Sequence, residues 1–309
     1  MRFHKLDLNL LVALDVLLKE RSVTKAAEQL SLSPSAVSSA LSRLREYFGD
    51  ELLVQIGRRM DLTPRAEGLQ DAVRDVLLRI DSSIATQPAF EPRGSDRTFR
   101  LYASDYTQFV WAPSLLRRAA QAGFTGNFEF LPQVTDPHRE LERGEADLVI
   151  IPSRMMSEDH PSDLLYEEGF VCLVGRESEL ARGELTFERY LAAGHVVMNP
   201  PTPQADSFEG WFLKRYGVSR RVAVKTYSFT VLPALVSGTE YIATVHARLA
   251  ERMTHTCPLV THPCPIQIEP MRQCMQWHRY REKDPGIQWL RGIAADATLH
   301  MDRTFRAHP

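Results

Sequence analysis

Apolar residues recur at helical spacing in three short segments near the start of the chain. The first segment runs from about Asp7, which can serve as an N-cap, to about Glu20, and has a broad leucine-rich side. The second, "VTKAAEQL", follows the potential cap Ser22, and its alanines are small enough for close contact between helices. The third starts at Ser33-Pro34, an N-cap followed by a proline at the first helical position. The pattern therefore predicts three consecutive short helices.

The end of the third segment and the stretch after it carry different signals. Gly49 stands where a helix commonly ends in a left-handed residue. "ELLVQIGRRMDLTP" then holds two short apolar runs around Gly57-Arg58-Arg59, which predicts a small β-hairpin.

A longer helix is predicted from Thr63-Pro64 to about Ser83. Its apolar positions advance by three or four residues, close to the spacing of a coiled-coil seam, at Leu69, Val73, Val76, Ile80 and Ile84. Such a seam can pack on its own domain or pair with a second copy of the chain. We favour pairing because the opposite side is charged and because "ATQPAFEPRGSD", just beyond it, has the composition of a hinge.

From Arg97 onward the pattern changes to alternating strands and helices. "TFRLYAS", "NFEFLPQ", "ADLVIIPS" and "HVVMNP" are typical of strands, and helical segments separate them. Such alternation predicts a parallel α/β sheet with helices on both faces. The tail ends in a turn at Asp284-Pro285-Gly286 and a final amphipathic helix.

Composition and charge narrow the class of protein. The chain has 309 residues, enough for about two domains, and its 44% hydrophobic and 25% charged residues are typical of a globular protein. No apolar run is long enough to span a membrane and no secretory signal is visible, so a cytoplasmic protein without membrane association is expected. Four cysteines are too few for a disulfide scaffold of this size. The formal net charge is −2, although the first 65 residues hold ten basic and eight acidic side chains.

The exposed side of the third predicted helix is unusual. It carries a row of small hydroxyls together with two arginines, Arg43 and Arg45. Serine is a middling helix former, and an idle solvated face is more often rich in lysine and glutamate. This face is suited to lie against a close-packed, acidic surface.

These residues resemble the N-terminal domain of the LysR-type transcriptional regulators. The resemblance rests on "DLNLLVALDVLLKERSVTKAAEQLSLSPSAVSSALSRLREYFGDELLV" and "TPRAEGL", and it is most specific over residues 6–68. The opening is most similar to the NodD/NahR branch, whose members respond to aromatic inducers. "ADLVIIPS" and "DPGIQWLR" also look like segments of that branch's effector domain.

The resemblance implies three parts. They are a winged helix-turn-helix over residues 1–65, a dimerising linker helix and hinge over 66–95, and an effector domain over 96–309. The effector domain would consist of two doubly wound α/β lobes like a periplasmic binding protein. Lobe I would cover about 96–166 and 270–309, and lobe II about 167–269, with crossings near Glu167–Phe170 and Pro263–Glu269.

The DNA-binding residues follow from the physics of helix-turn-helix recognition. A helix with small residues on one side fits a major groove, and its N-terminal residues reach base edges while arginines contact phosphates. The expected DNA-contacting residues are Ser33, Ser35, Ser38, Ser39, Ser42, Arg43, Arg58 and Arg59. Any single serine could instead be a solvated or capping residue. Where many relatives begin this helix with serine-glutamine-proline, this chain has Ser33-Pro34-Ser35, so a glutamine contact to a base is not expected.

A small-molecule effector is expected at the carboxyl ends of the strands of the C-terminal part. Polar and aromatic residues gather there in the sequence, and the candidates are Ser104, Tyr106, Thr107, Ser153, Asn199, Phe208, Phe229, Thr230 and His246. For each aromatic the interpretation as a core residue is favoured, and the small polar residues could equally be ordinary turn residues. His246 could sense the charge of the effector or be a satisfied residue of its lobe.

Two other functions remain open at this point. "HTCPLVTHPCP" places His255, Cys257, His262 and Cys264 at a regular spacing that could serve a metal- or redox-responsive regulator, although compact zinc sites have closer cysteine pairs. The second alternative is an enzyme or solute-binding module with a vestigial helix-turn-helix. No phosphate loop, nucleophile elbow, dinucleotide motif or His-Glu-x-x-His is present, so no catalytic residue and no cofactor is expected.

The expected function is therefore a DNA-binding transcriptional regulator that responds to a small, aromatic effector. Its expected partners are double-stranded promoter or operator DNA, the effector, and other copies of the chain in a homodimer or homotetramer. The resemblance also makes RNA polymerase a candidate partner.

Overall fold

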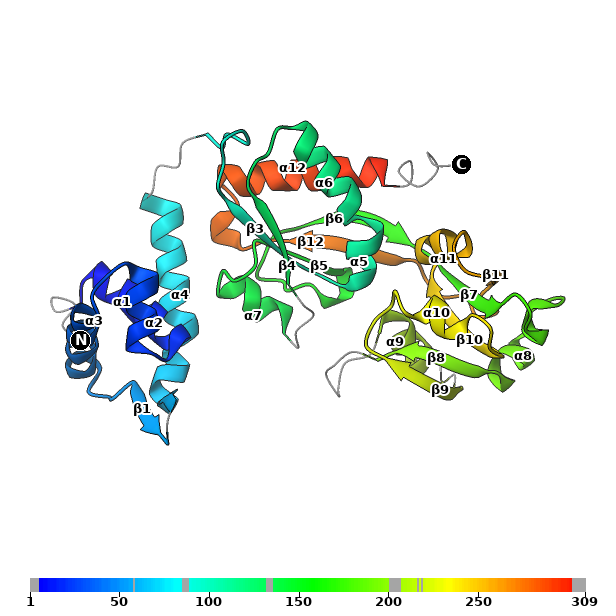
Figure 1. Cartoon of the computed structure of the whole chain (residues 1–309), viewed down its shortest axis with the longest axis horizontal. Coiled ribbons are helices and arrows are strands. Elements are labelled where there is room, and N and C mark those ends of the chain that lie inside the picture. The colour runs from blue at the N-terminus through cyan, green and yellow to red at the C-terminus, as the bar shows by residue number, and fades with distance from the viewer. Residues whose placement is uncertain are drawn as a thin grey trace. The chain divides into compact units, whose positions relative to one another are not determined.

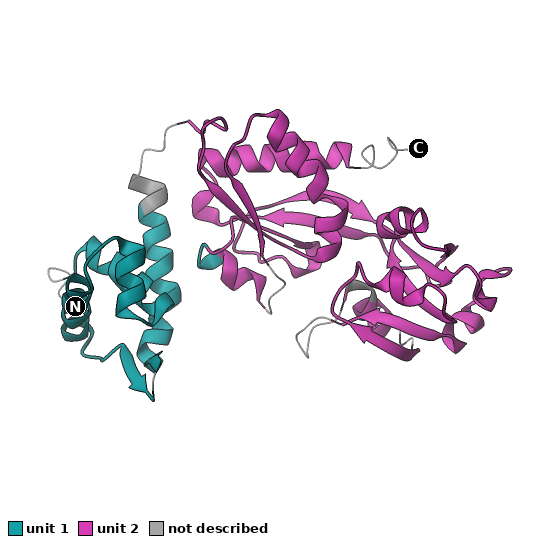
Figure 2. Ribbon diagram, viewed as in Figure 1, with its two compact units in different colours: residues 1–87, 142–144 teal, residues 88–141, 145–309 magenta. Residues whose placement is uncertain are grey.

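The computed structural model consists of two compact units. It describes residues 6–57, 59–84, 89–131, 136–199, 207–215, 217 and 219–301. One unit comprises Met1–Gln87 with Glu142–Gly144, and the other comprises Pro88–Leu141 with Glu145–Pro309 (Figure 2). Among the described residues, no helix is both long enough and apolar enough to cross a membrane.

The first unit begins with the three predicted helices and the hairpin (Figure 1). Its elements are α1 (Leu8–Glu20), α2 (Val23–Leu30), α3 (Pro34–Phe48), β1 (Leu53–Ile56), β2 (Arg59–Leu62) and α4 (Pro64–Ile84). The predicted caps are confirmed, because the Asp7 side chain accepts a hydrogen bond from Leu10 N at 2.9 Å and Ser22 accepts one from Lys25 N at 3.4 Å. Gly49 ends α3 with a φ of 60°, the left-handed conformation that its position predicted.

The long helix α4 divides its apolar positions between two environments. Val73 is buried in the core of the first unit, and Leu69 and Leu77 pack against that core. Arg74 also forms an ion pair with Asp15 of α1 at 2.6 Å. The prediction that the whole seam pairs with another copy is thus wrong for its first half, because α1 covers that part. Val76, in contrast, is 42% exposed.

The second unit contains two five-stranded sheets, each in its own lobe (Figure 1). Lobe I holds β3 (Thr98–Ala103), β4 (Asn127–Leu131), β5 (Leu148–Pro152), β6 (Ser162–Glu168) and β12 (Met271–Gln276), in the order β4-β3-β5-β12-β6. Its helices are α5 (Asp105–Val110), α6 (Ala112–Gln121), α7 (Pro137–Glu142) and α12 (Pro285–His300), with the 3₁₀ turns η2 (Ser153–Met155) and η4 (Arg279–Arg281).

Lobe II lies between β6 and β12 in the sequence. Its strands are β7 (Phe170–Gly175), β8 (Gly194–Met198), β9 (Arg221–Thr226), β10 (Tyr241–His246) and β11 (Leu259–Pro263), in the order β11-β7-β10-β8-β9. Its helices are α8 (Phe187–Ala192), α9 (Phe208–Arg215), α10 (Leu232–Val236) and α11 (Ala247–Thr254), with the 3₁₀ turn η3 (Glu179–Ala181).

Both sheets are mixed rather than purely parallel, which corrects the sequence-based expectation. In lobe I, β3 pairs in parallel with β4 and β5, whereas β12 runs antiparallel between β5 and β6. In lobe II, β7 runs antiparallel to both β10 and β11. Strands β7 and β12 are the ones that run opposite to the other strands of their sheets. Each is the first strand after a crossing between the lobes, so the chain enters it from the other lobe and no helical crossover makes it parallel to a neighbour. The helix–strand alternation along the sequence could not reveal this.

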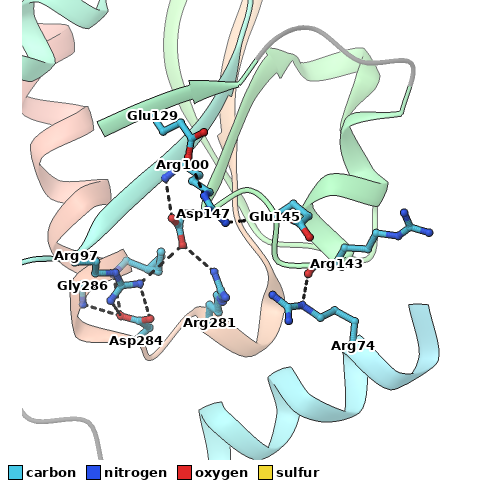
Figure 3. Close-up of polar contacts among 11 residues, drawn as sticks. Arg74, Arg97, Arg100, Glu129, Arg143, Glu145, Asp147, Arg281, Asp284 and Gly286 are labelled. Atoms are coloured by element: carbon cyan, nitrogen blue, oxygen red, sulfur yellow. Dashed lines mark hydrogen bonds and ion pairs between the residues drawn. The ribbon is translucent and has the colours of Figure 1, made fainter. Parts of the chain in front are cut away.

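A cluster of ion pairs joins the start of lobe I to its last helix (Figure 3). Arg97 donates two hydrogen bonds to the Asp284 carboxylate, each 2.8 Å long, and Asp284 also caps α12 through Gly286 N and Ile287 N. Asp147, at the start of β5, accepts hydrogen bonds from Arg281 and from Arg100 N, both at 2.8 Å. Burial alone would raise the pKa of Asp284, but the hydrogen bonds and charge of Arg97 outweigh it and hold the pKa below its ordinary value.

Candidate functional site

Helix α3 is fixed in orientation by its buried side. Val37 and Leu44 are fully buried and Leu41 is 5% exposed, all within the core of the first unit. The Ser33 hydroxyl caps the helix by accepting a hydrogen bond from Ala36 N at 3.2 Å, with Pro34 at the first position. The opposite side of α3 is therefore held toward solvent.

That solvent side carries the residues expected to contact DNA. All six of the expected residues on and before α3 are exposed, namely Ser33, Ser35, Ser38, Ser39, Ser42 and Arg43. Their hydrogen bonds are local: Ser42 donates to Ser38 O at 3.1 Å, and the hydroxyls of Ser33 and Ser35 lie 3.0 Å apart. These hydroxyls bond within their own helix and its cap. The side chains on this face therefore remain small, and their hydroxyls can still form hydrogen bonds with another molecule.

Arg43 and Arg45 have different roles although they are two residues apart. Arg43 pairs with Asp7 at 3.2 Å, and more than half of each side chain is exposed. An exposed pair of this kind contributes little stability, so Arg43 can exchange its partner for a phosphate. Arg45 instead donates to Glu51 O at 2.8 Å and Leu53 O at 2.9 Å. The expectation that Arg45 belongs to the serine-rich face is therefore wrong, because its guanidinium holds the start of the hairpin.

The hairpin offers a second cationic position. β1 and β2 pair antiparallel from Leu53–Leu62 to Ile56–Arg59, and Arg59 is exposed at the tip. Arg58 lies outside the described residues. The helix α3 has small side chains and an arginine at its flank, and the hairpin beside it has a cationic tip. This combination is suited to enter the major groove of DNA and to bind the adjacent phosphate backbone.

In the second unit, the carboxyl end of β3 is one of the places where the two lobes are in contact. Ser104 caps α5, because its hydroxyl accepts a hydrogen bond from Thr107 N at 3.2 Å. Thr107 is fully buried, and its hydroxyl accepts a hydrogen bond from Gln273 Nε2 of β12 at 3.2 Å. The two predicted residues thus shape the start of α5.

Aromatic rings from both lobes stack beside this helix. The rings of Tyr106 and His246 lie parallel at 3.7 Å between centres, and Phe229 packs edge-on at 4.9 Å from His246. The Tyr106 hydroxyl donates to the buried carboxylate of Glu168, which also pairs with Arg248 at 2.9 Å. Burial raises the pKa of Tyr106 well above its ordinary value, so the ring stays neutral.

His246 is an uncharged member of this stack. Its exposed fraction is 3%, and burial lowers its pKa to about 3, only partly opposed by the charge of Asp105. At neutral pH its ring is therefore uncharged, which favours the packing interpretation of His246 over charge sensing.

A carboxylate that was not among the predicted residues connects the lobes at the same place. Asp105 Oδ2 accepts hydrogen bonds from Ser228 Oγ at 2.6 Å and from both Thr230 N and Thr230 Oγ1 at 2.9 Å. Asp105 and Ser228 each lie close to a strand end in the sequence, but only the fold shows that they meet across the lobes. Glu168, Arg248 and Gln273 were also missed, since each lies far from α5 in the sequence.

The remaining expected effector residues lie elsewhere or cannot be placed. Ser153 and Asn199 are exposed at the ends of β5 and β8, and Asn199 N donates to Thr226 O at 2.7 Å. Phe208 begins α9, and its side chain lies outside the described residues. The structure therefore brings together six of the nine candidates, namely Ser104, Tyr106, Thr107, Phe229, Thr230 and His246.

The cysteine–histidine stretch does not form a compact site. All four cysteines are free, and the described part of the chain contains no group of three or more metal-type ligands. Cys257 precedes and Cys264 follows the five-residue strand β11, whose ends are roughly 13 Å apart at a rise of about 3.3 Å per residue. That distance exceeds the reach of a disulfide, so the geometry disfavours a Cys257–Cys264 redox pair.

Comparisons with known proteins agree with this architecture. Residues 8–67 match the bacterial regulatory helix-turn-helix domain of the lysR family, and residues 92–298 match the LysR substrate binding domain. Nodulation protein D 1 of Rhizobium tropici is 42% identical over 294 residues, which cover 95% of this chain and 95% of that protein.

Solved structures show the same fold. The crystal structure of a probable transcriptional regulator from Pseudomonas aeruginosa is 29% identical, with a TM-score of 0.67, and the match covers 95% of this chain and 98% of that chain. A full-length variant of OxyR from the same organism is 16% identical, with a TM-score of 0.76, and the match covers 95% of this chain and 94% of that chain. The chain therefore belongs to the LysR family of bacterial DNA-binding transcriptional regulators.

Proposed function

We propose that this regulator reads its DNA site with α3 and the β1–β2 hairpin, and that a small aromatic effector bound between the lobes controls it. The observation that carries the DNA-binding part is the exposed serine row of α3, held outward by buried Val37, Leu41 and Leu44. Serine hydroxyls can meet bases or phosphates without adding bulk, while Arg43 and Arg59 supply charge.

The effector part rests on the region where the lobes meet. Aromatic rings and hydrogen-bonding groups from both lobes lie together there, around Tyr106, Phe229 and Thr230. A ligand that changes the contacts between the lobes would shift their relative position, and that movement would be passed to the DNA-binding parts. We further propose that the chain acts as a homodimer, paired through a surface of α4 that includes the exposed Val76.

A gel-shift experiment with DNA from the regulator's own promoter region tests the DNA-binding residues. We expect Arg43→Ala with Arg59→Ala to weaken binding at least about tenfold and to lower the slope of log affinity against log salt by about 2, since two phosphate contacts are lost. Arg182→Ala removes a 75% exposed arginine of lobe II and serves as the matched control. An unchanged salt dependence in the double variant would refute the assignment of these arginines.

A further inference from the structure

The contact between Asp105 and lobe II is a complete binding site for one carboxylate oxygen. Ser228 Oγ, Thr230 N and Thr230 Oγ1 all donate to Asp105 Oδ2, at 2.6, 2.9 and 2.9 Å. Two hydroxyls and a backbone N–H converging on one anionic oxygen form charge-assisted hydrogen bonds. Lobe II therefore presents three hydrogen-bond donors that suit an anionic oxygen, and Asp105 of lobe I occupies them.

The negative charge of Asp105 is met by neutral donors rather than by a cation. Within the described parts of the chain, Asp105 forms no ion pair. The guanidinium of Arg154, at the end of the neighbouring strand, lies over the Trp211 ring, 4.7 Å from its centre. Glu168 is already paired with Arg248, so that pair adds no net charge. Asp105 is thus bonded to no cation within the described residues. The buried guanidinium of Arg252 also lies between the lobes, but it donates to the carbonyl oxygens of Phe109 and Val110 at the other end of α5.

Asp105 also remains accessible beside aromatic groups. Its side chain is only half-buried, whereas the adjacent Tyr106 is buried against His246 and Phe229. An aromatic ligand that entered here with a carboxylate would compete with Asp105 for the same three donors and would meet its like charge. Like charges brought together in this way are strongly disfavoured.

We propose that Asp105 sets the charge selectivity of the effector site. Its carboxylate occupies the hydrogen-bond donors of Ser228 and Thr230 and repels the like charge of a carboxylate effector, so such effectors are rejected. This inference rests on the proposed effector site between the lobes. Uncharged ligands escape the repulsion, and replacing Asp105 with a small neutral residue frees the three donors for the carboxylate of a ligand.

The test compares two probes of nearly equal shape, salicylate and salicylamide, by isothermal titration on the full-length protein. In Asp105→Ser, we expect the affinity for salicylate to rise at least about tenfold over the original protein, while the affinity for salicylamide changes much less. Asp105→Asn, which removes the charge but keeps the volume, should show a smaller gain. Circular dichroism and thermal melting confirm that each variant is folded.

A triple variant separates anion capture from a general loosening of the lobes. Asp105→Ser with Ser228→Ala and Thr230→Val lacks the hydroxyl donors and should lose the gain for salicylate. The proposal is overturned if Asp105→Ser gains nothing for salicylate, gains equally for both probes, or keeps its gain in the triple variant. Gel shifts on the same preparations test the proposed function separately, because all three variants should still bind promoter DNA.

Discussion

At the scale of single residues, chemically similar side chains have distinct roles set by their partners. Arg43 is exposed with a weak surface partner, whereas Arg45 is committed to two backbone carbonyls. The sequence indicated that both arginines lay on the serine-rich face, since helical spacing alone leaves the partner of a long side chain undetermined. The same limit applied to Asp105, whose partners come from another lobe.

Gly286 is a position where there is no room for a side chain beside Arg97. A Cβ at this position would lie 2.2 Å from Arg97 Nη1, so alanine would push the guanidinium away from Asp284. We expect Gly286→Ala to lower the free energy of unfolding by about 2 kcal/mol, because it disrupts a half-buried, bidentate ion pair. Urea denaturation followed by fluorescence measures this change.

A second glycine of the same helix provides the control for that prediction. No heavy atom lies within 4 Å of a Cβ built on Gly292, which is exposed on α12. Gly292→Ala should therefore stabilise the protein by about 0.5–1 kcal/mol, as expected for alanine in an open helix position. A loss of stability in both variants would show that the Arg97 contact is not the cause.

His246 should make the stability of the protein sensitive to mild acid. Burial lowers its pKa to about 3, while the unfolded chain takes up this proton below about pH 6.5. Because the unfolded state binds more protons over that window, stability falls as the pH falls, by about 2 kcal/mol between pH 7 and pH 5. His246→Phe keeps a ring against Tyr106 and should remove the contribution of His246 to this loss of stability. Urea titrations of both proteins at pH 7 and at pH 5 measure the difference.

If His246→Phe retained the full acid sensitivity of the original protein, another buried group would have to account for it.

At the scale of elements, the first unit was predictable in detail and the second only in outline. Caps such as Asp7, Ser22 and Ser33 act within a few residues, so the sequence contains the whole signal. The mixed order of the two sheets depends on pairings such as Met271 with Glu168, far apart in the sequence. No local pattern reports such a pairing, and for this reason the interlobe cluster could be anticipated only in part.

The connection between α3 and the hairpin gives a prediction for these elements. Arg45→Met keeps the aliphatic stem but removes the hydrogen bonds to Glu51 O and Leu53 O. We expect a loss of about 1–2 kcal/mol in stability, because Arg45 is about one-third exposed and solvent replaces part of each bond. DNA binding in gel shifts should weaken as well, since the hairpin is no longer held beside α3.

Arg43→Met is the matched comparison on the same helix. It should weaken DNA binding while leaving the thermal melting temperature unchanged, because its pair with Asp7 is exposed. Equal melting temperatures for both variants would contradict the structural role of Arg45.

At the scale of the whole molecule, the division of α4 determines how copies of the chain can pair. Leu69 and Val73 are committed to the core of their own unit, and Val76 remains exposed farther along the helix. The proposed pairing surface on α4 therefore excludes Leu69 and Val73 and includes the exposed Val76. The sequence showed the full seam but could not show that α1 covers its beginning.

Sedimentation measurements on charged variants test this pairing. Val76→Glu should shift the protein toward monomer without lowering its stability, because a buried charge would be introduced only at the interface between copies. Val12→Glu is the control, since Val12 of α1 is 41% exposed and nearly matches Val76 in this respect. Self-association that is unaffected by Val76→Glu would place the dimer interface elsewhere.

The insertion of lobe II between β6 and β12 has a mechanical consequence. Met271 stands opposite Glu168, so both tethers of lobe II leave the lobe I sheet from the same pair of neighbouring strands. Because these two attachment points are close together, any tilt of lobe II displaces β6 and β12 together. Because β12 lies between β5 and the edge strand β6, the load enters the sheet through its edge strand and the strand beside it, and β12 passes it directly to β5.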